Sequence, residues 1–215
     1  MDLLNLDKLS TEAKMLDITP DQTSLGLPTE DFAKTSSVVT GRLKLFSINS
    51  PIDESVRDKI SKFRNEFTSQ GDNLDGSAGL GEAASLDEWF AQIQDNSSIE
   101  TVRENMVPAS TYLALDQHDH IVGIADIRHS LNDYLLAAGG HIGYSVRPSQ
   151  RRQGYGKEIL FLALLKCREL GINRVLLSCD SENIASEKII LANGGQLENC
   201  VIFGDKVKKR YWIEL

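Results

Sequence analysis

Cysteine is scarce in this sequence, and its spacing matches neither a disulfide framework nor a metal site. The three residues, Cys167, Cys179 and Cys200, are an odd number. They are therefore expected to be reduced and mostly buried thiols. The histidine-containing segment 118–120 offers two histidines and an aspartate, but a solvated turn explains the same residues without a third ligand nearby. We expect no metal.

Long apolar runs and targeting signals are also missing. No stretch approaches the roughly 18 consecutive apolar residues that a membrane span needs, and MDLLNLDKLSTEAK lacks the basic-then-apolar order of a secretory signal. A cytoplasmic protein without a membrane partner is the expectation. The formal net charge of −8 disfavours nucleic acid as a partner, although the basic run at 206–210 could bind an anion.

The chain length suits one sizeable domain, because 215 residues can bury a hydrophobic core without disulfides or metal ions. Residues 1–41 are polar and are predicted to form an N-terminal extension to a domain over residues 42–215. Apolar periodicity and turn signals predict the elements of that domain. In chain order these are a strand at 42–48, a helix opened by Ser50 and Pro51, a loop at 69–84, a helix capped by Ser85 and Glu88, strands at 109–115, 121–127 and 141–146, a helix at 154–170, a strand at 174–179, a helix at 184–192, and strands at 201–203 and 210–213. The pattern predicts an α/β fold, in the layered α+β sense, with helices flanking a mixed, mostly antiparallel central sheet.

The most informative segment is HIGYSVRPSQRRQGYGKEILFLALLKCREL, in which a strand leads through a basic, glycine-containing loop into a helix. This order aims free backbone N–H groups at one point. Gly154 and Gly156 allow close approach of a ligand, while Arg151 and Arg152 add positive charge. A diphosphate site is the prediction. The alternative is an ordinary strand-to-helix turn, since the hexapeptide pattern arises by chance in about one chain in five of this length.

Several further motifs in register with this loop make the chain from about residue 42 to 215 resemble the GNAT superfamily of acyl-CoA-dependent N-acetyltransferases. The matching features are the Arg/Gln-x-x-Gly-x-Gly/Ala signature at Arg151, Gly154 and Gly156, the upstream Val146-x-Pro148, the strand RVLLSCD, and the helix opened by NIAS at 183–186. The segments IRHSLNDYL, GGHIGYSVRPS and RYWIEL resemble in particular an uncharacterised bacterial branch of the superfamily.

The resemblance implies a GNAT-like domain that moves an acetyl group from acetyl-CoA, as co-substrate, to a small-molecule or peptide amine by direct attack. It implies that backbone groups at 144–146 pair with the pantetheine arm of the donor. The cofactor-binding residues that it implies are Ser145, Val146, Arg151, Arg152, Gln153, Gly154, Tyr155, Gly156, Asn183 and Ser186. For Asn183, a simple helix cap is an equal alternative. A homodimer is compatible with this picture.

Direct attack needs a base for the amine, and His141 is the first candidate because it opens the strand beside the loop and titrates near neutral pH. A hydrogen-bonded structural histidine is the alternative interpretation of His141. His129 and Asp126 are the next candidates. Relatives often have a tyrosine as acid where this chain has Ile190, so we expect Tyr144 or another group to take its place. The substitution also leaves open an alternative function, a catalytically weak or inactive acyl-CoA-binding regulatory module.

Overall fold

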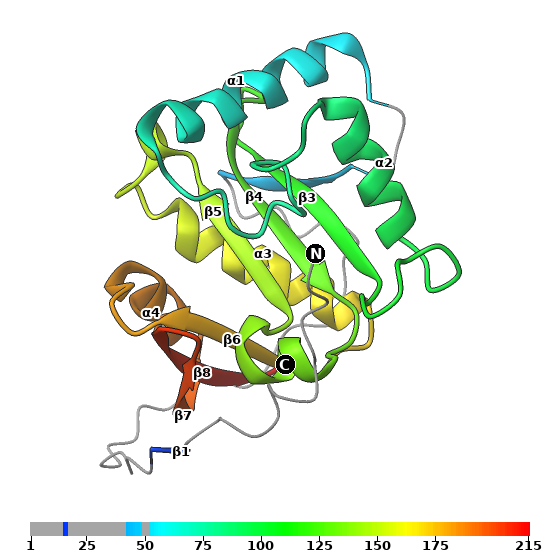
Figure 1. The fold of residues 1–215 in the computed structure, drawn as a ribbon. Helices are drawn as coiled ribbons and strands as arrows, with labels where there is room; N and C mark the ends of the chain where they lie inside the picture. The colour runs from blue at the N-terminus through cyan, green and yellow to red at the C-terminus, as the bar shows by residue number, and fades with distance from the viewer. Residues whose placement is uncertain (1–14, 17–41, 49–51) are drawn as a thin grey trace.

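The computed structural model describes residues 15–16, 42–48 and 52–215 (Figure 1). The predicted N-terminal extension, residues 1–41, therefore lies outside the described residues except for the two-residue strand β1 (Met15–Leu16), which pairs with β7. The proposed boundary between extension and domain stays a prediction. No helix within the described ranges is long and apolar enough to cross a membrane.

The described strands form two four-stranded sheets, with the orders β2-β3-β4-β5 and β1-β7-β8-β6, and every pair of neighbours runs antiparallel. The elements after β1 are β2 (Lys44–Ser47), α1 (Glu54–Gln70), α2 (Leu86–Asn96), β3 (Ala109–Leu115), β4 (Ile121–Arg128), the π-helix η2 (Leu135–Gly139), β5 (Ile142–Val146), the 3-10 helix η3 (Pro148–Gln150), α3 (Tyr155–Glu169), β6 (Arg174–Asp180), α4 (Ile184–Leu191), β7 (Gln196–Phe203) and β8 (Lys206–Glu214). The predicted α/β fold with mostly antiparallel strands and flanking helices is confirmed.

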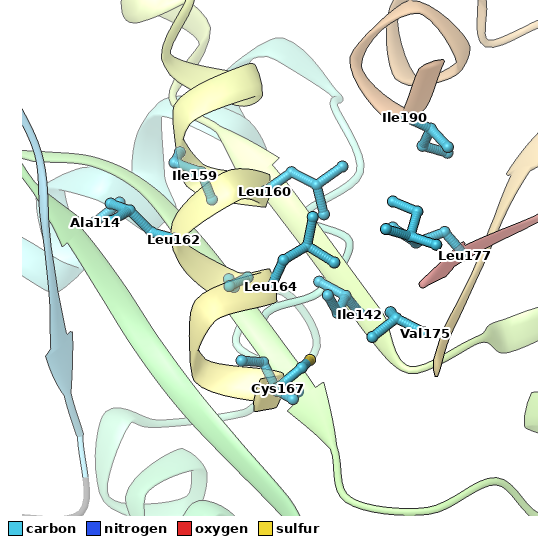
Figure 2. Close-up of a cluster of buried hydrophobic side chains, with 14 of the residues drawn as sticks. Ala114, Ile142, Ile159, Leu160, Leu162, Leu164, Cys167, Val175, Leu177 and Ile190 are labelled. Atoms are coloured by element: carbon cyan, nitrogen blue, oxygen red, sulfur yellow. The ribbon is translucent and has the colours of Figure 1, made fainter. Parts of the chain in front are cut away.

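Helices cover both faces of the first sheet, α1 and α2 on one side and α3 on the other (Figure 1). Neighbouring residues of β4 point to opposite faces, so Ile124 packs with α1 and α2 while Ala125 packs with α3. On its other flank α3 faces the second sheet, where its Leu160 points toward Leu177 of β6 and Ile190 of α4 (Figure 2). One helix thus holds the two sheets together.

The start of α1 differs from the prediction. The helix begins at Glu54, and the side chain of Asp53 caps it by accepting a hydrogen bond from the backbone N–H of Val56 at 2.9 Å. The predicted cap and first turn, Ser50 and Pro51, lie outside the described residues. The helix begins later than predicted, since Asp53 is an equally favoured cap. The buried face of α1 carries Ile60, Phe63 and Phe67.

Strands β7 and β8 are longer than predicted. The segment GDKVKK was expected to separate them, but only Gly204 and Asp205 form the turn, and its lysines belong to β8. Because β8 pairs with β6 and β7 on its two edges, its backbone bonds are satisfied whatever the polarity of its side chains. The predicted cap of α2 is confirmed, with Ser85 accepting from the N–H of Glu88.

The two sheets meet at a short contact between the start of β5 and β6 and then diverge. His141 donates its backbone N–H to the carbonyl of Leu176 at 2.7 Å, and the backbone N–H of Leu176 donates to Nδ1 of His141 at 2.9 Å. Beyond this point no strand pairing joins β5 to β6 within the described residues. Gly140 is required here, because a Cβ on it would lie 2.7 Å from the carbonyl oxygen of Leu176. Beyond the contact with Leu176, the edge of β5 that faces β6 is therefore unpaired among the described residues.

Candidate functional site

The loop between β5 and α3 forms a cradle of backbone N–H groups. Arg152 and Gly154, with φ of 63° and 84°, adopt left-handed conformations and turn the chain sharply into the helix. The N–H groups of residues 152–157 make no hydrogen bond to any described residue. Successive free amides at a helix N-terminus form an anion-binding concavity, and the helix dipole adds to its positive potential. The free N–H groups that the sequence predicts are therefore present, and their binding of a diphosphate stays a prediction.

Contacts from distant parts of the chain hold this cradle in place. Glu66 of α1 accepts a hydrogen bond from Nε of Arg147 at 2.5 Å and another from the backbone N–H of Ser149 at 2.6 Å. Burial opposes the charge of Glu66, but these hydrogen bonds outweigh it and lower the pKa of that carboxyl. On the other flank, Arg42 donates to the carbonyl of Gln153 at 3.3 Å and pairs with Glu158 at 2.9 Å.

The two arginines of the loop, Arg151 and Arg152, have different surroundings. The guanidinium of Arg151 pairs with Asp72 at 2.8 Å, and its Nε donates to the carbonyl of Val146 at 3.3 Å. Part of the positive charge predicted for an anion is thus already compensated by the loop that follows α1. Arg152 is exposed beside the cradle. The side chain of Gln153 donates to that of Gln150 at 3.1 Å and so stiffens the loop.

Side chains from β5 extend to both sides of its open edge. Ser145 donates to the carbonyl of Asp75 at 2.7 Å, on the side of α1 and α2. The hydroxyl of Tyr144 lies 3.2 Å from that of Ser186, so Tyr144 bridges the gap from β5 to α4. Burial raises the pKa of Tyr144 to about 12. Asn183 caps α4 by accepting from the N–H of Ser186 at 3.0 Å, which confirms the helix-cap interpretation.

The two histidines proposed as bases are engaged in local hydrogen bonds. His141 is 7% exposed, and its Nδ1 accepts from the N–H of Leu176, which supports the structural alternative. His129 shares a hydrogen bond with Ser110 at 2.9 Å. Burial lowers the pKa of both imidazoles, so both favour the neutral form. Their catalytic role stays a prediction.

Asp126 was a later candidate than His141 for the base, but its position suits that role better. It is 4% exposed, it stands opposite Gly143 of β5 in the strand register, and it lines a pocket on that side of the sheet. Thr111 donates to it at 2.9 Å, and Arg128 pairs with it at 3.2 Å. Burial raises its pKa more than Arg128 and Thr111 lower it. The sequence feature that marks Asp126 as a candidate is its position as the one charged residue in the apolar run IVGIADI.

Two other residues weighed from the sequence belong to the core. Ile190 is fully buried, so no acid stands at that position of α4. Cys179 is 5% exposed, and burial raises the pKa of its thiol to about 11, which disfavours the nucleophilic thiolate. At the β3–β4 turn, Nδ1 of His120 lies 3.1 Å from Asp116, as expected of a solvated turn.

Comparison with known proteins identifies a family match and several structural neighbours. Residues 78–196 match the model of the acetyltransferase (GNAT) domain. No curated protein matches the chain by sequence. An acetyltransferase from Salmonella typhimurium that modifies the N-terminal serine of ribosomal protein L7/L12 is similar in structure, with a TM-score of 0.56, 20% identity and coverage of 82% of this chain and 96% of that one.

Two further structures show the same fold. A ribosomal L7/L12 alpha-N-protein acetyltransferase in complex with coenzyme A has a TM-score of 0.57 and 21% identity, covering 83% of this chain and 96% of that one. A spermidine/spermine N-acetyltransferase from Vibrio cholerae has a TM-score of 0.54 and 15% identity, covering 81% of this chain and 95% of that one. At these identities the likeness concerns the fold.

Proposed function

Because the chain belongs to the GNAT family of acetyltransferases, which use acetyl-CoA as the acyl donor, we propose that residues 42–215 form one catalytic domain that acetylates an amine by direct attack. The acceptor is a small molecule or a peptide. Two structural neighbours are described as acting on amines, one at a protein N-terminus and one on spermidine, which supports an amine acceptor in general.

The cradle is the observation that supports this proposal most strongly. The free N–H groups of residues 152–157 suit the diphosphate of the donor, since a hydrogen bond to a charged group contributes on the order of 1.5–3 kcal/mol net. Several such bonds hold a diphosphate without a metal. The open edge of β5 offers backbone groups at 144–146 to the pantetheine arm. We assign donor binding to Ser145, Val146, Arg151, Arg152, Gln153, Gly154, Tyr155, Gly156, Asn183 and Ser186.

The reaction forms one C–N bond and breaks one C–S bond. The amine loses its proton to a base and attacks the thioester carbonyl carbon, and the coenzyme leaves as a thiol after gaining a proton. We assign the base to Asp126, because it lines the pocket beside Gly143 and its pKa is raised. Tyr144 is the candidate acid, because a phenol with a pKa of about 12 keeps its proton at neutral pH.

Substitution of Gly154 by Asp tests the donor site. Any side chain is strained at a φ of 84°, and a carboxylate there repels a diphosphate, so we expect Gly154→Asp to lose acetyl-CoA binding in calorimetric titration. Gly171, at the other end of α3, is the matched control, because its φ is 77° and a Cβ on it would have no other heavy atom within 4 Å. Gly171→Asp carries the same strain and charge and should bind normally. Equal affinity in the two variants would refute the donor site.

The regulatory alternative is favoured by one observation, the burial of Ile190 where relatives have the acid. General acid help contributes about 10²- to 10⁴-fold, so its loss slows a reaction rather than abolishing it. The two functions differ in steady-state release of the coenzyme thiol in the presence of an amine. Acetyl-CoA binding without any such release would favour the regulatory module.

A further inference from the structure

A pocket of about 320 Å³ lies beside β5, between the segment 74–79, helix α2 and the end of β4. Figure 1 shows the chain between α1 and α2 crossing in front of β5. The pocket adjoins Gly143, because a Cβ on that glycine would lie 2.7 Å from Cα of Gly76 and 3.3 Å from Nη1 of Arg128, both lining residues. The cavity therefore opens next to the strand that is proposed to hold the donor.

Asn96, the last residue of α2, supplies the most specific feature of this pocket. It is 8% exposed and lines the cavity, yet its side chain makes no hydrogen bond to any residue that the structure describes. The neighbouring amide of Gln92, by contrast, donates to the carbonyl of Ala78 at 2.9 Å. Among the described residues the fully buried side-chain atoms without a hydrogen-bond partner belong to Asp180, Arg210 and Trp212, so the amide of Asn96 still contacts the open space of the pocket. Its donors and its acceptor oxygen are therefore available to a ligand. An unpaired amide that lines a cavity beside a reaction site suits a ligand.

The charges around the pocket indicate the charge of the ligand that it favours. Asp126 and Arg128 pair with each other at 3.2 Å and compensate each other's charge. Asp75 and Glu82, which also line the pocket, add negative charge at its exposed rim. A cation is therefore favoured over a phosphorylated or otherwise anionic amine. An amine with only apolar groups would leave the amide of Asn96 unpaired.

We propose that this pocket is the acceptor site and that the acceptor is a small primary amine carrying an amide group, which the side chain of Asn96 binds. An asparagine side chain offers one donor face and one acceptor oxygen, and an amide of the ligand complements both at once. The inference rests on the proposed function and adds to it the chemical class of the acceptor.

Glycinamide and isobutylamine form a matched pair of probes, because they have nearly the same shape and differ in the amide. The steady-state release of the coenzyme thiol gives kcat/KM for each amine, and the ratio of the two values is compared between the natural protein and Asn96→Leu. The different basicities of the two amines cancel in that comparison. We expect the preference for glycinamide to fall about tenfold or more in Asn96→Leu, the effect of losing hydrogen bonds to a polar group of the site.

Stability and donor affinity separate this role from a structural one. Because the amide of Asn96 has no partner among the described residues, Asn96→Leu should melt at the same temperature as the natural protein or higher. Its affinity for acetyl-CoA should be unchanged. Gln94→Leu, on an exposed position of the same helix, is the matched control and should keep the preference. Asn96→Asp, which keeps the volume, should also lose it.

Three outcomes would overturn the inference. The first is an unchanged preference in both Asn96 variants, and the second is a natural protein that releases no thiol with glycinamide although it binds acetyl-CoA. The third is equal loss in Gln94→Leu. In each case the donor site survives, whereas a natural protein that fails to bind acetyl-CoA contradicts the proposed function itself.

Discussion

Asp126 combines features that a catalytic base needs and that a purely structural carboxylate rarely has. It lines the pocket, and burial raises its pKa above the ordinary value of 3.8, although Arg128 and Thr111 lower it. A base in the acceptor pocket works in its ionised form, so activity should rise with pH as Asp126 loses its proton. The raised pKa places this rise above the ordinary range of an aspartate.

Asp126→Asn should lower kcat by about 10²-fold or more and leave acetyl-CoA affinity unchanged. The same variant should lose the acidic limb of the pH profile of kcat. Thr111→Val is a useful companion, because the lost hydrogen bond lowered the pKa of Asp126 and its removal should move the limb to higher pH. Steady-state kinetics across pH would check both. A kcat of Asp126→Asn within twofold of normal would exclude Asp126 as the base.

The junction of β5 and β6 determines where the sheets separate. His141 makes it from both its backbone and its ring, and the pair of hydrogen bonds with Leu176 fixes the point beyond which the edge of β5 is open. Trp212 of β8 lies against the imidazole, with 6.5 Å between ring centroids. An unpaired strand edge is a surface on which another extended chain can add by backbone hydrogen bonds. The open edge of β5 thus depends on how β5 and β6 separate.

His141→Ala should destabilise the fold by about 1–3 kcal/mol, because it leaves the buried N–H of Leu176 unpaired. Burial lowers the pKa of His141 below its ordinary value of 6.5 in the folded state. Its contribution to stability is therefore full above pH 6.5 and is lost as the pH falls from there through the lowered pKa, and the variant should show a smaller such loss. Urea denaturation at several pH values measures this.

His118→Ala, at the exposed β3–β4 turn, is the matched control for that experiment and should change stability little. The result that would support a catalytic role for His141 is the reverse pattern. Turnover would fall in His141→Ala while its free energy of unfolding stayed equal to that of the natural protein.

At the scale of the whole molecule, the proposed donor touches both sheets. The cradle opens α3, which packs against both of them, and Ser186 belongs to α4 beside the second sheet. A ligand that binds only this assembled arrangement stabilises the folded state as a whole. Linkage gives about 2.7 kcal/mol at 100 times the dissociation constant.

Acetyl-CoA at that concentration should therefore raise the melting temperature by about 5–10 °C for a chain of this size. A thermal melt with and without the ligand measures the shift, and Gly154→Asp under the same conditions provides the control without a donor site. The absence of any shift in the natural protein would contradict the assignment of acetyl-CoA binding to the cradle.

Local features of the chain were predictable because their cause lies within a few neighbouring residues. The cradle and its left-handed Gly154 are encoded in one contiguous segment, and the cap made by Ser85 and the buried face of α1 follow from short spacings. One such prediction failed locally. The helix α1 begins at Glu54 behind the cap Asp53, because two equally suitable caps, Ser50 and Asp53, lie close together in sequence.

The convergence of side chains from distant segments was decided by tertiary structure alone. Glu66 reaches the cradle from 81 residues away along the chain, as its hydrogen bond to Arg147 shows. Asn96 and Asp126 meet at one pocket only because α2 packs against β3, the neighbour of β4 in the sheet. The sequence by itself determined the elements, the cradle and the family, since those depend on local order. Packing decided the pocket and the ranking of Asp126 over His141, since burial and partners arise only when the layers assemble.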